Sequence, residues 1–242
     1  MKIKILTLFP KMLEGVFGES IIKRAIDKGV CNIEIIDLRD YSLSKHKHVD
    51  DTPYGGGAGM VLACDVVDRA IIANSNSNSY KILMTPQGRR YSHSVAKELI
   101  SKEELLLICG HYEGFDERIR DYVDDEISLG DFVLTGGELA AAMVADSVIR
   151  LLNNAIKQES YEDDSFANGL LEYPQFTRPY EYKGKKVPDV LVNGNHKLIA
   201  EYRKKESLRK TYLRRPDLLD KYIFDDKEKK LMKEIIEEEG EE

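Results

Sequence analysis

Glycine-containing turns with polar neighbours are the part of this sequence best suited to binding a ligand. One turn, Gly110-His111-Tyr112-Glu113-Gly114, directly follows an apolar run, Leu105 to Cys109. A short apolar run that ends at a glycine is typical of a strand buried on both faces. The turn is therefore predicted to lie at the carboxyl end of a buried strand, where ligands bind in open α/β sheets.

Two further turns repeat this pattern. Thr85 to Arg90 follows an expected strand at 80–84, and Gly136-Gly137 follows an apolar segment at 127–134 that is broken by Gly130-Asp131. The three strands, ending at residue 84, at residue 109 and near residue 134, are expected to direct their ends toward one ligand.

The second glycine turn is also expected to begin a helix that runs from Gly136 to about Leu152. Thr135 and Glu138 have the spacing of a capping box, in which each side chain satisfies a backbone amide. Small residues in this helix would permit close helix approach, for example between subunits: Ala140, Ala141, Ala142 and Ala145. Asp146 and Arg150 share one face, and an ion pair between them is the simplest explanation of their spacing.

Strands and helices alternate along the first two thirds of the chain, which predicts an α/β fold with a mostly parallel sheet covered by helices. The other expected elements are a strand at 3–9, a helix at 12–28 with a second short helix capped by Ser20, a strand at 33–38, and helices at 63–73 and 92–100. Residues 39–59 form a long glycine-rich loop, and such loops are usually functional or mobile. This loop lacks the Lys-Ser/Thr of a P-loop.

Length and composition indicate a globular protein in a reducing compartment. The chain has 242 residues, of which 42% are hydrophobic and 33% charged. No apolar run approaches the roughly 18 residues of a membrane span, and the first ten residues are interpreted as a strand and not as a signal peptide. Three widely spaced cysteines in apolar surroundings favour a cytoplasmic location, and no zinc-ligand spacing is present.

Charge is distributed unevenly in the C-terminal third, which is expected to form a small helical domain. Residues 178–215 contain twelve Lys and Arg against four Asp and Glu, a formal charge of +8, whereas residues 216–242 carry −6. A basic segment can bind phosphates although the whole chain has a net charge of −7. A solvated helical face is the alternative explanation. Helices are expected from 195–196 onward, at 208–213, at 216–222 and at 227–239, after a linker at 153–170 without periodicity.

Several segments together resemble the bacterial tRNA (guanine-N1)-methyltransferases, the TrmD family of SPOUT methyltransferases. They are YGGGAGM (54–60), TPQGR (85–89), CGHYEGFDER (109–118), ISLGDFVLTGGELA (127–140), DSVIR (146–150), DDSFANGLLEYPQFTRP (163–179), VPDVLVNGNH (187–196) and LRRPDLL (213–219). They cover nearly the whole chain in the family's order, and as a set they are highly specific.

The resemblance implies a homodimer with a SPOUT-type trefoil knot, which nothing in the composition or periodicity would suggest. It implies an S-adenosylmethionine-binding domain at 1–160, a flexible linker at 161–170 and a helical tRNA-binding domain at 171–242. The residues that it assigns to S-adenosylmethionine are Pro86, Gln87, Gly88, Gly110, Tyr112, Glu113, Gly114, Leu129, Gly130, Asp131, Phe132, Val133, Leu134, Gly136 and Gly137. This assignment agrees with the three converging strand ends.

The resemblance further implies methylation of N1 of the guanine immediately 3′ of the anticodon (position thirty-seven) in tRNA. Asp164 would be the general base, acting on the partner chain's site, and Arg150 would stabilise charge on the guanine oxygen. The anticodon stem-loop would contact Arg178, Lys197, Arg209, Arg214 and Arg215. The resemblance also implies a dependence on Mg²⁺, with Glu113 as a candidate neighbour of the ion and its ligands unassigned.

Three positions depart from the family pattern. His111 stands where the family often has arginine, residues 151–157 (LLNNAIK) replace a segment with Pro-Gly, and Tyr202 replaces a frequent tryptophan. Other functions stay open as alternatives: a SPOUT enzyme acting on ribosomal RNA, or a non-catalytic RNA-binding protein. A dinucleotide-dependent oxidoreductase is weakened because Pro10 follows the first strand in place of a glycine fingerprint.

Overall fold

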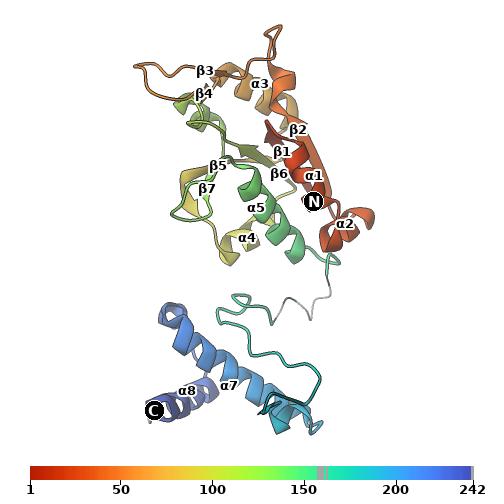
Figure 1. The fold of residues 1–242 in the computed structure, drawn as a ribbon, viewed down its shortest axis with the longest axis vertical. Helices are drawn as coiled ribbons and strands as arrows, with labels where there is room; N and C mark the ends of the chain where they lie inside the picture. Colours follow the sequence, from red (N-terminus) through yellow and green to blue (C-terminus); the bar gives the residue numbers. More distant parts are fainter. Residues whose placement is uncertain (157–160, 162, 241–242) are drawn as a thin grey trace. The chain divides into compact units, whose positions relative to one another are not determined.

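Two compact units, residues 1–158 and 159–242, make up the chain (Figure 1). A computed structural model describes residues 1–156, 161 and 163–240. The domain boundary suggested after residue 160 falls outside these ranges, as do residue 157 of the segment 151–157 and residue 162 of the expected linker. No helix among the described residues is long and apolar enough to cross a bilayer.

A five-stranded parallel sheet forms the centre of the first unit, with the strand order β2-β1-β6-β5-β7. Its strands are β1 (Lys2–Thr7), β2 (Asn32–Asp37), β5 (Ser79–Arg90), β6 (Glu104–Cys109) and β7 (Asp125–Ser128). Strand β6 is buried at every residue, because it has neighbouring strands on both edges and helices on both faces. The predicted α/β fold with a mostly parallel sheet is confirmed.

Helices cover both faces of this sheet, because side chains alternate along each strand. Leu105, Leu107 and Cys109 pack with α1 (Lys11–Phe17), α2 (Ser20–Asp27), α4 (His93–Leu99) and α5 (Glu138–Leu151). Leu106 and Ile108 pack with α3 (Cys64–Asn74) and with the 3₁₀ helices η1 (Leu38–Tyr41) and η2 (Glu117–Tyr122). The loop expected at 39–59 is shorter than predicted, because that range contains most of η1 and the short strand β3 (Asp50–Asp51). Its glycine-rich part lies between β3 and the antiparallel strand β4 (Val61–Leu62).

The capping box predicted for α5 is absent. The helix begins at Glu138, its N-cap is Gly137, and no side chain caps it. Glu138 is fully buried and accepts a hydrogen bond from Thr7 instead, so its carboxylate is not available to the backbone amide of Thr135. The four alanines of α5 pack inside the core of the first unit, so the close helix approach that they allow occurs within the chain.

Strand β7 ends at Ser128 and not near Leu134, because the Ser128 hydroxyl bonds to the backbone of Gly130 and the chain turns there. Strand β5 is correspondingly longer than predicted. Its ladder with β7 is interrupted, since Met84 and Arg89 both pair with Ile127 while residues 85–88 lie outside the ladder. The expected turn at 85–90 is therefore an interruption within one strand.

The second unit is built around two helices, α7 (His196–Arg214) and α8 (Asp226–Gly240). Helix α7 begins where predicted, with the Asn195 side chain accepting from the amides of Lys197 and Leu198. The separate helix expected at 208–213 is wrong, because α7 continues through it and buries Leu208 in a small core. The remaining elements are β8 (Glu181–Tyr182), β9 (Lys185–Lys186), η3 (Asp189–Leu191) and η4 (Pro216–Lys221).

Candidate functional site

A cavity of about 460 Å³ opens at the carboxyl ends of β6 and β7 and at the interruption of the strand between them, β5. This volume lies in the usual range of small-molecule sites. Twelve residues predicted to bind a cofactor line it: Pro86, Gln87, Gly110, Tyr112, Glu113, Gly114, Leu129, Phe132, Val133, Leu134, Gly136 and Gly137. Three others, Gly88, Gly130 and Asp131, are not in its lining. The predicted meeting of three segments at one site is confirmed, although only β6 ends where it was expected: the other two segments are the interruption within β5 and the residues that follow β7.

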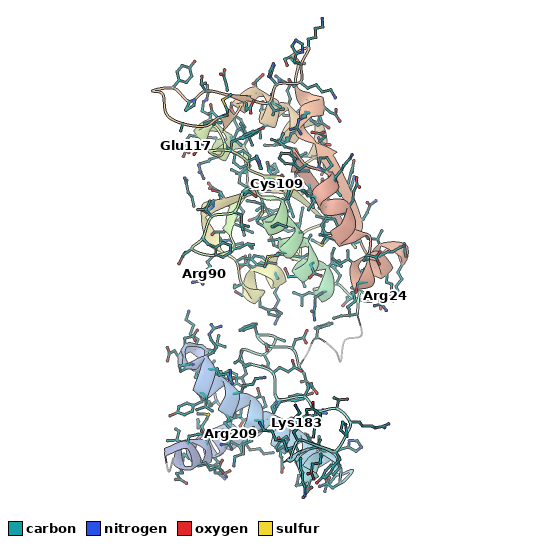
Figure 2. All side chains as sticks on the ribbon, in the orientation of Figure 1. Arg24, Arg90, Cys109, Glu117, Lys183 and Arg209 are labelled. Atoms are coloured by element: carbon teal, nitrogen blue, oxygen red, sulfur yellow. The ribbon has the colours of Figure 1, made fainter. Side chains whose placement is uncertain are left out.

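The glycine turns of this cavity are fixed against each other by backbone contacts. The Gly137 amide donates a 2.8 Å hydrogen bond to the Gly110 carbonyl, and His111 forms a bridge with Gly136. A β-carbon at Gly137 would lie 2.8 Å from the Cα of Cys109, so only glycine fits this approach. Cys109, labelled in Figure 2, is fully buried, and burial raises the pKa of its thiol well above the ordinary value. This cysteine therefore supports the site as an inert packing residue.

Gly88 directly follows residues 85–87, which line the cavity from the interrupted part of β5. A β-carbon at this position would lie 2.4 Å from the backbone of Glu126 and Ile127. Residues 85–88 lie outside the ladder between β5 and β7, and the ladder resumes at Arg89. The backbone can pass this close to β7 only because residue 88 has no side chain. Gly88 thus shapes the 85–87 segment without lining the cavity.

Tyr112 has a backbone φ of 57°, which is uncommon for a residue with a side chain. Its ring meets the ring of His111 edge-on, with 4.9 Å between the centroids. Burial raises the pKa of the Tyr112 phenol, and the nearby Asp50 carboxylate raises it further by its charge and by a hydrogen bond. The phenol is therefore a neutral hydrogen-bonding group at physiological pH.

The glycine-rich loop reaches the rim of the cavity at its carboxyl end, a role that the sequence left undefined. The Glu113 amide donates to the Met60 carbonyl at 3.0 Å, and the Leu62 amide donates to the Gly114 carbonyl at 2.9 Å. Gly59 lies against the Glu113 side chain, whose carboxylate oxygen would be 2.3 Å from a β-carbon there. The end of the loop thus fixes residues 113–114 through contacts on the side of the turn that does not face the 136–137 turn.

Arg120 lines the cavity and was not identified from the sequence. Its guanidinium donates hydrogen bonds to Gln87 and Glu126 and forms a 2.9 Å ion pair with Glu117, which is labelled in Figure 2. It connects η2, β7 and the interrupted part of β5. No sequence signal marks it, because an arginine in a polar segment is ordinarily a solvated surface residue.

His111 combines partial burial with an unsatisfied ring nitrogen. Its ring lies 4.7 Å from that of Phe9 between centroids, and among the described residues its buried Nδ1 has no hydrogen-bond partner. A β-carbon at Gly136 would lie 2.5 Å from this nitrogen. The His111 imidazole therefore fills the space beside the 136–137 turn. It is smaller than the arginine that the family often has at this position.

The two predicted catalytic residues belong to different compact units. Arg150 lies in the last turn of α5, in the first unit. Asp164 lies in a turn of the second unit, where its carbonyl accepts the amide of Ala167 at 3.1 Å. The following residues are tied to α7, because the Leu171 amide donates to the Thr211 hydroxyl at 2.9 Å.

The predicted RNA-binding residues fall into two groups. Arg209, labelled in Figure 2, is ion-paired with Glu206, Glu238 and Glu239, and Arg215 is paired with Asp217 at 2.7 Å. Within the described residues, the other three make no ion pair: Arg178, Lys197 and Arg214. Part of the positive charge of residues 178–215 is therefore neutralised within the second unit by the acidic residues of α8.

A metal centre is not formed by the side chains of residues 1–156, 161 and 163–240. No three His, Cys, Asp or Glu residues among them come together as ligands. Glu113 contributes one carboxylate, which by itself is too few for a site held by the protein alone. The described residues therefore do not fit a dedicated Mg²⁺ cage.

Comparison with known proteins gives matches over most or nearly all of the chain. A family model described as tRNA (Guanine-1)-methyltransferase TrmD matches residues 1–221. A tRNA (guanine-N(1)-)-methyltransferase of Geobacillus kaustophilus is 56% identical over 238 residues, covering 97% of this chain and 98% of the relative. Relatives with the same name from Bacillus licheniformis and Fusobacterium nucleatum are each 55% identical over 240 residues, and 97% and 99% of this chain is covered.

Proposed function

This chain belongs to the tRNA (guanine-1)-methyltransferase family, and we propose that it methylates N1 of a guanine in tRNA. The target is the guanine immediately 3′ of the anticodon, position thirty-seven. One observation carries the proposal beyond the family match: twelve of the fifteen residues expected to bind the methyl donor line a single cavity. Its methyl donor is S-adenosylmethionine.

The cavity fits this donor chemically. Its wall combines backbone groups of Gly110, Gly114 and Gly136 with the apolar side chains of Leu129 and Leu134. Exposed backbone amides and carbonyls can pair with the polar edge of an adenine, while apolar side chains cover its faces. The bound sulfonium supplies an electrophilic methyl group, so the protein has to align the acceptor and remove its proton.

Two residues of this chain provide that chemistry in the proposed mechanism. The Asp164 carboxylate takes the proton from guanine N1, which makes the nitrogen nucleophilic. Negative charge then develops on the guanine oxygen, and the Arg150 guanidinium stabilises it. Arg150 belongs to the same helix whose first turn borders the cavity, and Asp164 is supplied by the second unit of a partner chain.

A homodimer with a trefoil knot is part of this proposal. Exposed apolar side chains on the neighbouring helices α1 and α5 support association: Met12, Val16, Leu139 and Met143. Such residues are unfavourable in water and suit a second copy of the chain. The close backbone approaches at Gly88 and Gly137 are of the kind that tightly interleaved loops require.

The second unit is proposed to hold the tRNA anticodon stem-loop, and the protein to act in the cytoplasm. Arg178, Lys197 and Arg214 are the strongest candidates for phosphate contacts, because they have no acidic partner among the described residues. Arg209 and Arg215 are weaker candidates, because neighbouring carboxylates already neutralise part of their charge.

Methyl transfer to tRNA transcripts tests the function directly. Full-length protein with labelled S-adenosylmethionine should methylate a transcript with guanine at position thirty-seven and not one with adenine there. A ribosomal RNA fragment is the third RNA tested. If it is methylated in preference to tRNA, ribosomal RNA and not tRNA is the substrate. Equal labelling of the guanine and adenine transcripts would contradict the proposed target.

Variants test the assigned roles. In single turnover with excess enzyme, Asp164→Asn should lose at least about a hundredfold in rate, whereas the adjacent Asp163→Asn is the matched control. A loss below about tenfold removes Asp164 as the base. Arg150→Ala should still bind S-adenosylmethionine but barely methylate, and turnover at the wild-type rate excludes its role.

A further inference from the structure

A second cavity, of about 470 Å³, lies entirely within the second unit. Its wall comes from the segment before β8, from η3 and from the first turns of α7. The lining residues are Tyr173, Pro174, Gln175, Phe176, Thr177, Arg178, Tyr180, Val187, Leu191, Val192, Ile199 and Arg203. We call these twelve residues the aromatic groove. None of the assigned catalytic or donor-binding residues belongs to it.

Aromatic rings are the main surface that this groove offers. Phe176 is 46% exposed and Tyr180 45% exposed, although both belong to a segment with apolar neighbours. The Tyr180 hydroxyl donates a 2.5 Å hydrogen bond to Asp189, which fixes the ring in place. Preorganised and exposed rings suit a flat, unsaturated ligand, because stacking gains area with little loss of side-chain freedom.

Two arginines line the groove, and the carboxylates nearest to it, those of Asp189 and Glu172, bond to Tyr180 and Gln175. No Asp or Glu is among its twelve lining residues. Arg178 and Arg203 make no ion pair within the described part of the chain, and Arg203 instead lies over the Tyr173 ring at 4.7 Å. Farther along α7, by contrast, Lys205 and Arg209 are each paired with at least two glutamates. The groove is thus a place in this unit where guanidinium groups and aromatic faces are both available.

We propose that the aromatic groove binds one unpaired nucleotide of the RNA substrate, distinct from the guanine that is methylated. The base stacks on the exposed Phe176 ring, because Arg203 already lies over the ring of Tyr173. The adjoining phosphate pairs with Arg178 or Arg203. Aromatic platforms beside arginines bind single-stranded RNA in this way, whereas a paired stem does not expose its base faces. The proposal rests on the proposed function only in taking tRNA as the RNA.

Fluorescence from a base analogue can detect this stacking. An anticodon stem-loop RNA would carry 2-aminopurine at one loop position at a time, and full-length protein would be titrated into it. The chain contains no tryptophan, so the protein does not mask the signal. We expect strong quenching at one position other than the target. Phe176→Ala should abolish this quenching and weaken RNA binding roughly tenfold, while Phe176→Tyr should preserve both.

Two further variants separate stacking from loss of folding. Tyr182→Ala is the matched control, because Tyr182 is 63% exposed in the same unit but lies outside the groove lining. It should bind and quench like the wild type. Arg203→Gln removes a guanidinium from α7 and should weaken RNA binding with a smaller dependence on salt concentration. Circular dichroism of each variant should match that of the wild type.

The outcomes distinguish this inference from the proposed function. If wild-type protein methylates tRNA, but no second loop position is quenched and Phe176→Ala binds RNA normally, the groove proposal is overturned and the function stands. If quenching depends on Phe176 but no tRNA is methylated, the function fails and the groove proposal holds. An acidic peptide that binds the wild type but not Phe176→Ala, and that excess stem-loop RNA does not displace, would overturn the proposal in favour of a protein partner.

Discussion

The Thr7 hydroxyl donates a 2.7 Å hydrogen bond to the Glu138 carboxylate, which joins the end of β1 to the first residue of α5 across 131 positions of sequence. Both side chains are buried. The other oxygen of Glu138 would lie 2.3 Å from a β-carbon at Gly136, so the carboxylate supports the glycine turn that lines the cavity. Residues that never touch the proposed donor thereby determine the shape of its site.

Replacing Thr7 by valine tests this support. Valine keeps the shape but leaves the buried carboxylate without its donor, which should lower the free energy of unfolding by about 1–3 kcal/mol. The dissociation constant for S-adenosylmethionine should rise as the Gly136 turn loosens. Chemical denaturation and calorimetric titration measure the two effects. Thr7→Ser retains the hydroxyl and should behave like the wild type, whereas an unchanged Thr7→Val would show that the bond contributes nothing.

Sequence reasoning predicted the sheet and the cavity because both depend on local patterns. The buried run at 105–109, followed by Gly110, requires a strand with a turn at its end, and parallel strands place such ends together. Arg120 could not be found in this way. Its contacts with Gln87 and Glu117 depend on how η2 packs beside β5, and the residues around Arg120 in the sequence do not predict that packing.

Helix capping also shows that a local sequence pattern does not decide which contacts form. The spacing of Thr135 and Glu138 predicted a capping box that the structure lacks, whereas a reciprocal box occurs at Asp225 and Glu228. In the second case the Asp225 carboxylate accepts the Glu228 amide at 2.8 Å, and Glu228 accepts the Asp225 amide at 2.9 Å. The difference is tertiary, because Glu138 has the buried Thr7 hydroxyl as a competing partner.

Two glycines with opposite surroundings provide a paired test of the fold. Gly88→Ala would place a methyl group 2.4 Å from the backbone of β7, which must shift, so we expect marked destabilisation and loss of S-adenosylmethionine binding. Gly15→Ala, within α1, meets no atom within 4 Å and should stabilise the protein by about 0.5–1 kcal/mol. Thermal unfolding of both variants decides the point. A Gly88→Ala protein as stable as the wild type would contradict the close approach.

Arg120 is expected to affect donor binding without taking part in methyl transfer. Its hydrogen bond to Gln87 holds the interrupted part of β5, and hydrogen bonds to charged groups are worth about 1.5–3 kcal/mol. Arg120→Leu should therefore weaken S-adenosylmethionine binding by roughly tenfold or more. The rate at saturating donor should stay within a fewfold of the wild type. Arg118→Leu, exposed on the same 3₁₀ helix and paired with Asp116, is the control and should bind the donor normally.

Glu228 should make the stability of the second unit depend on pH. Burial by itself would raise the pKa of Glu228, but hydrogen bonds from the Asp225 amide, the Tyr222 hydroxyl and Lys204 outweigh it and lower the pKa below its ordinary value of 4.5. A carboxyl whose pKa is lower in the folded state stabilises the protein above its unfolded pKa and loses this contribution as the pH falls through the folded pKa. Glu228→Gln should therefore be less stable than the wild type by about 1 kcal/mol at pH 7, and the difference should shrink on acidification below pH 4.5.

Denaturation followed by circular dichroism at several pH values measures this difference in stability, with Glu237→Gln, an exposed position on the same helix, as control. A difference that is constant with pH would show that the charge of Glu228 does not stabilise the helix.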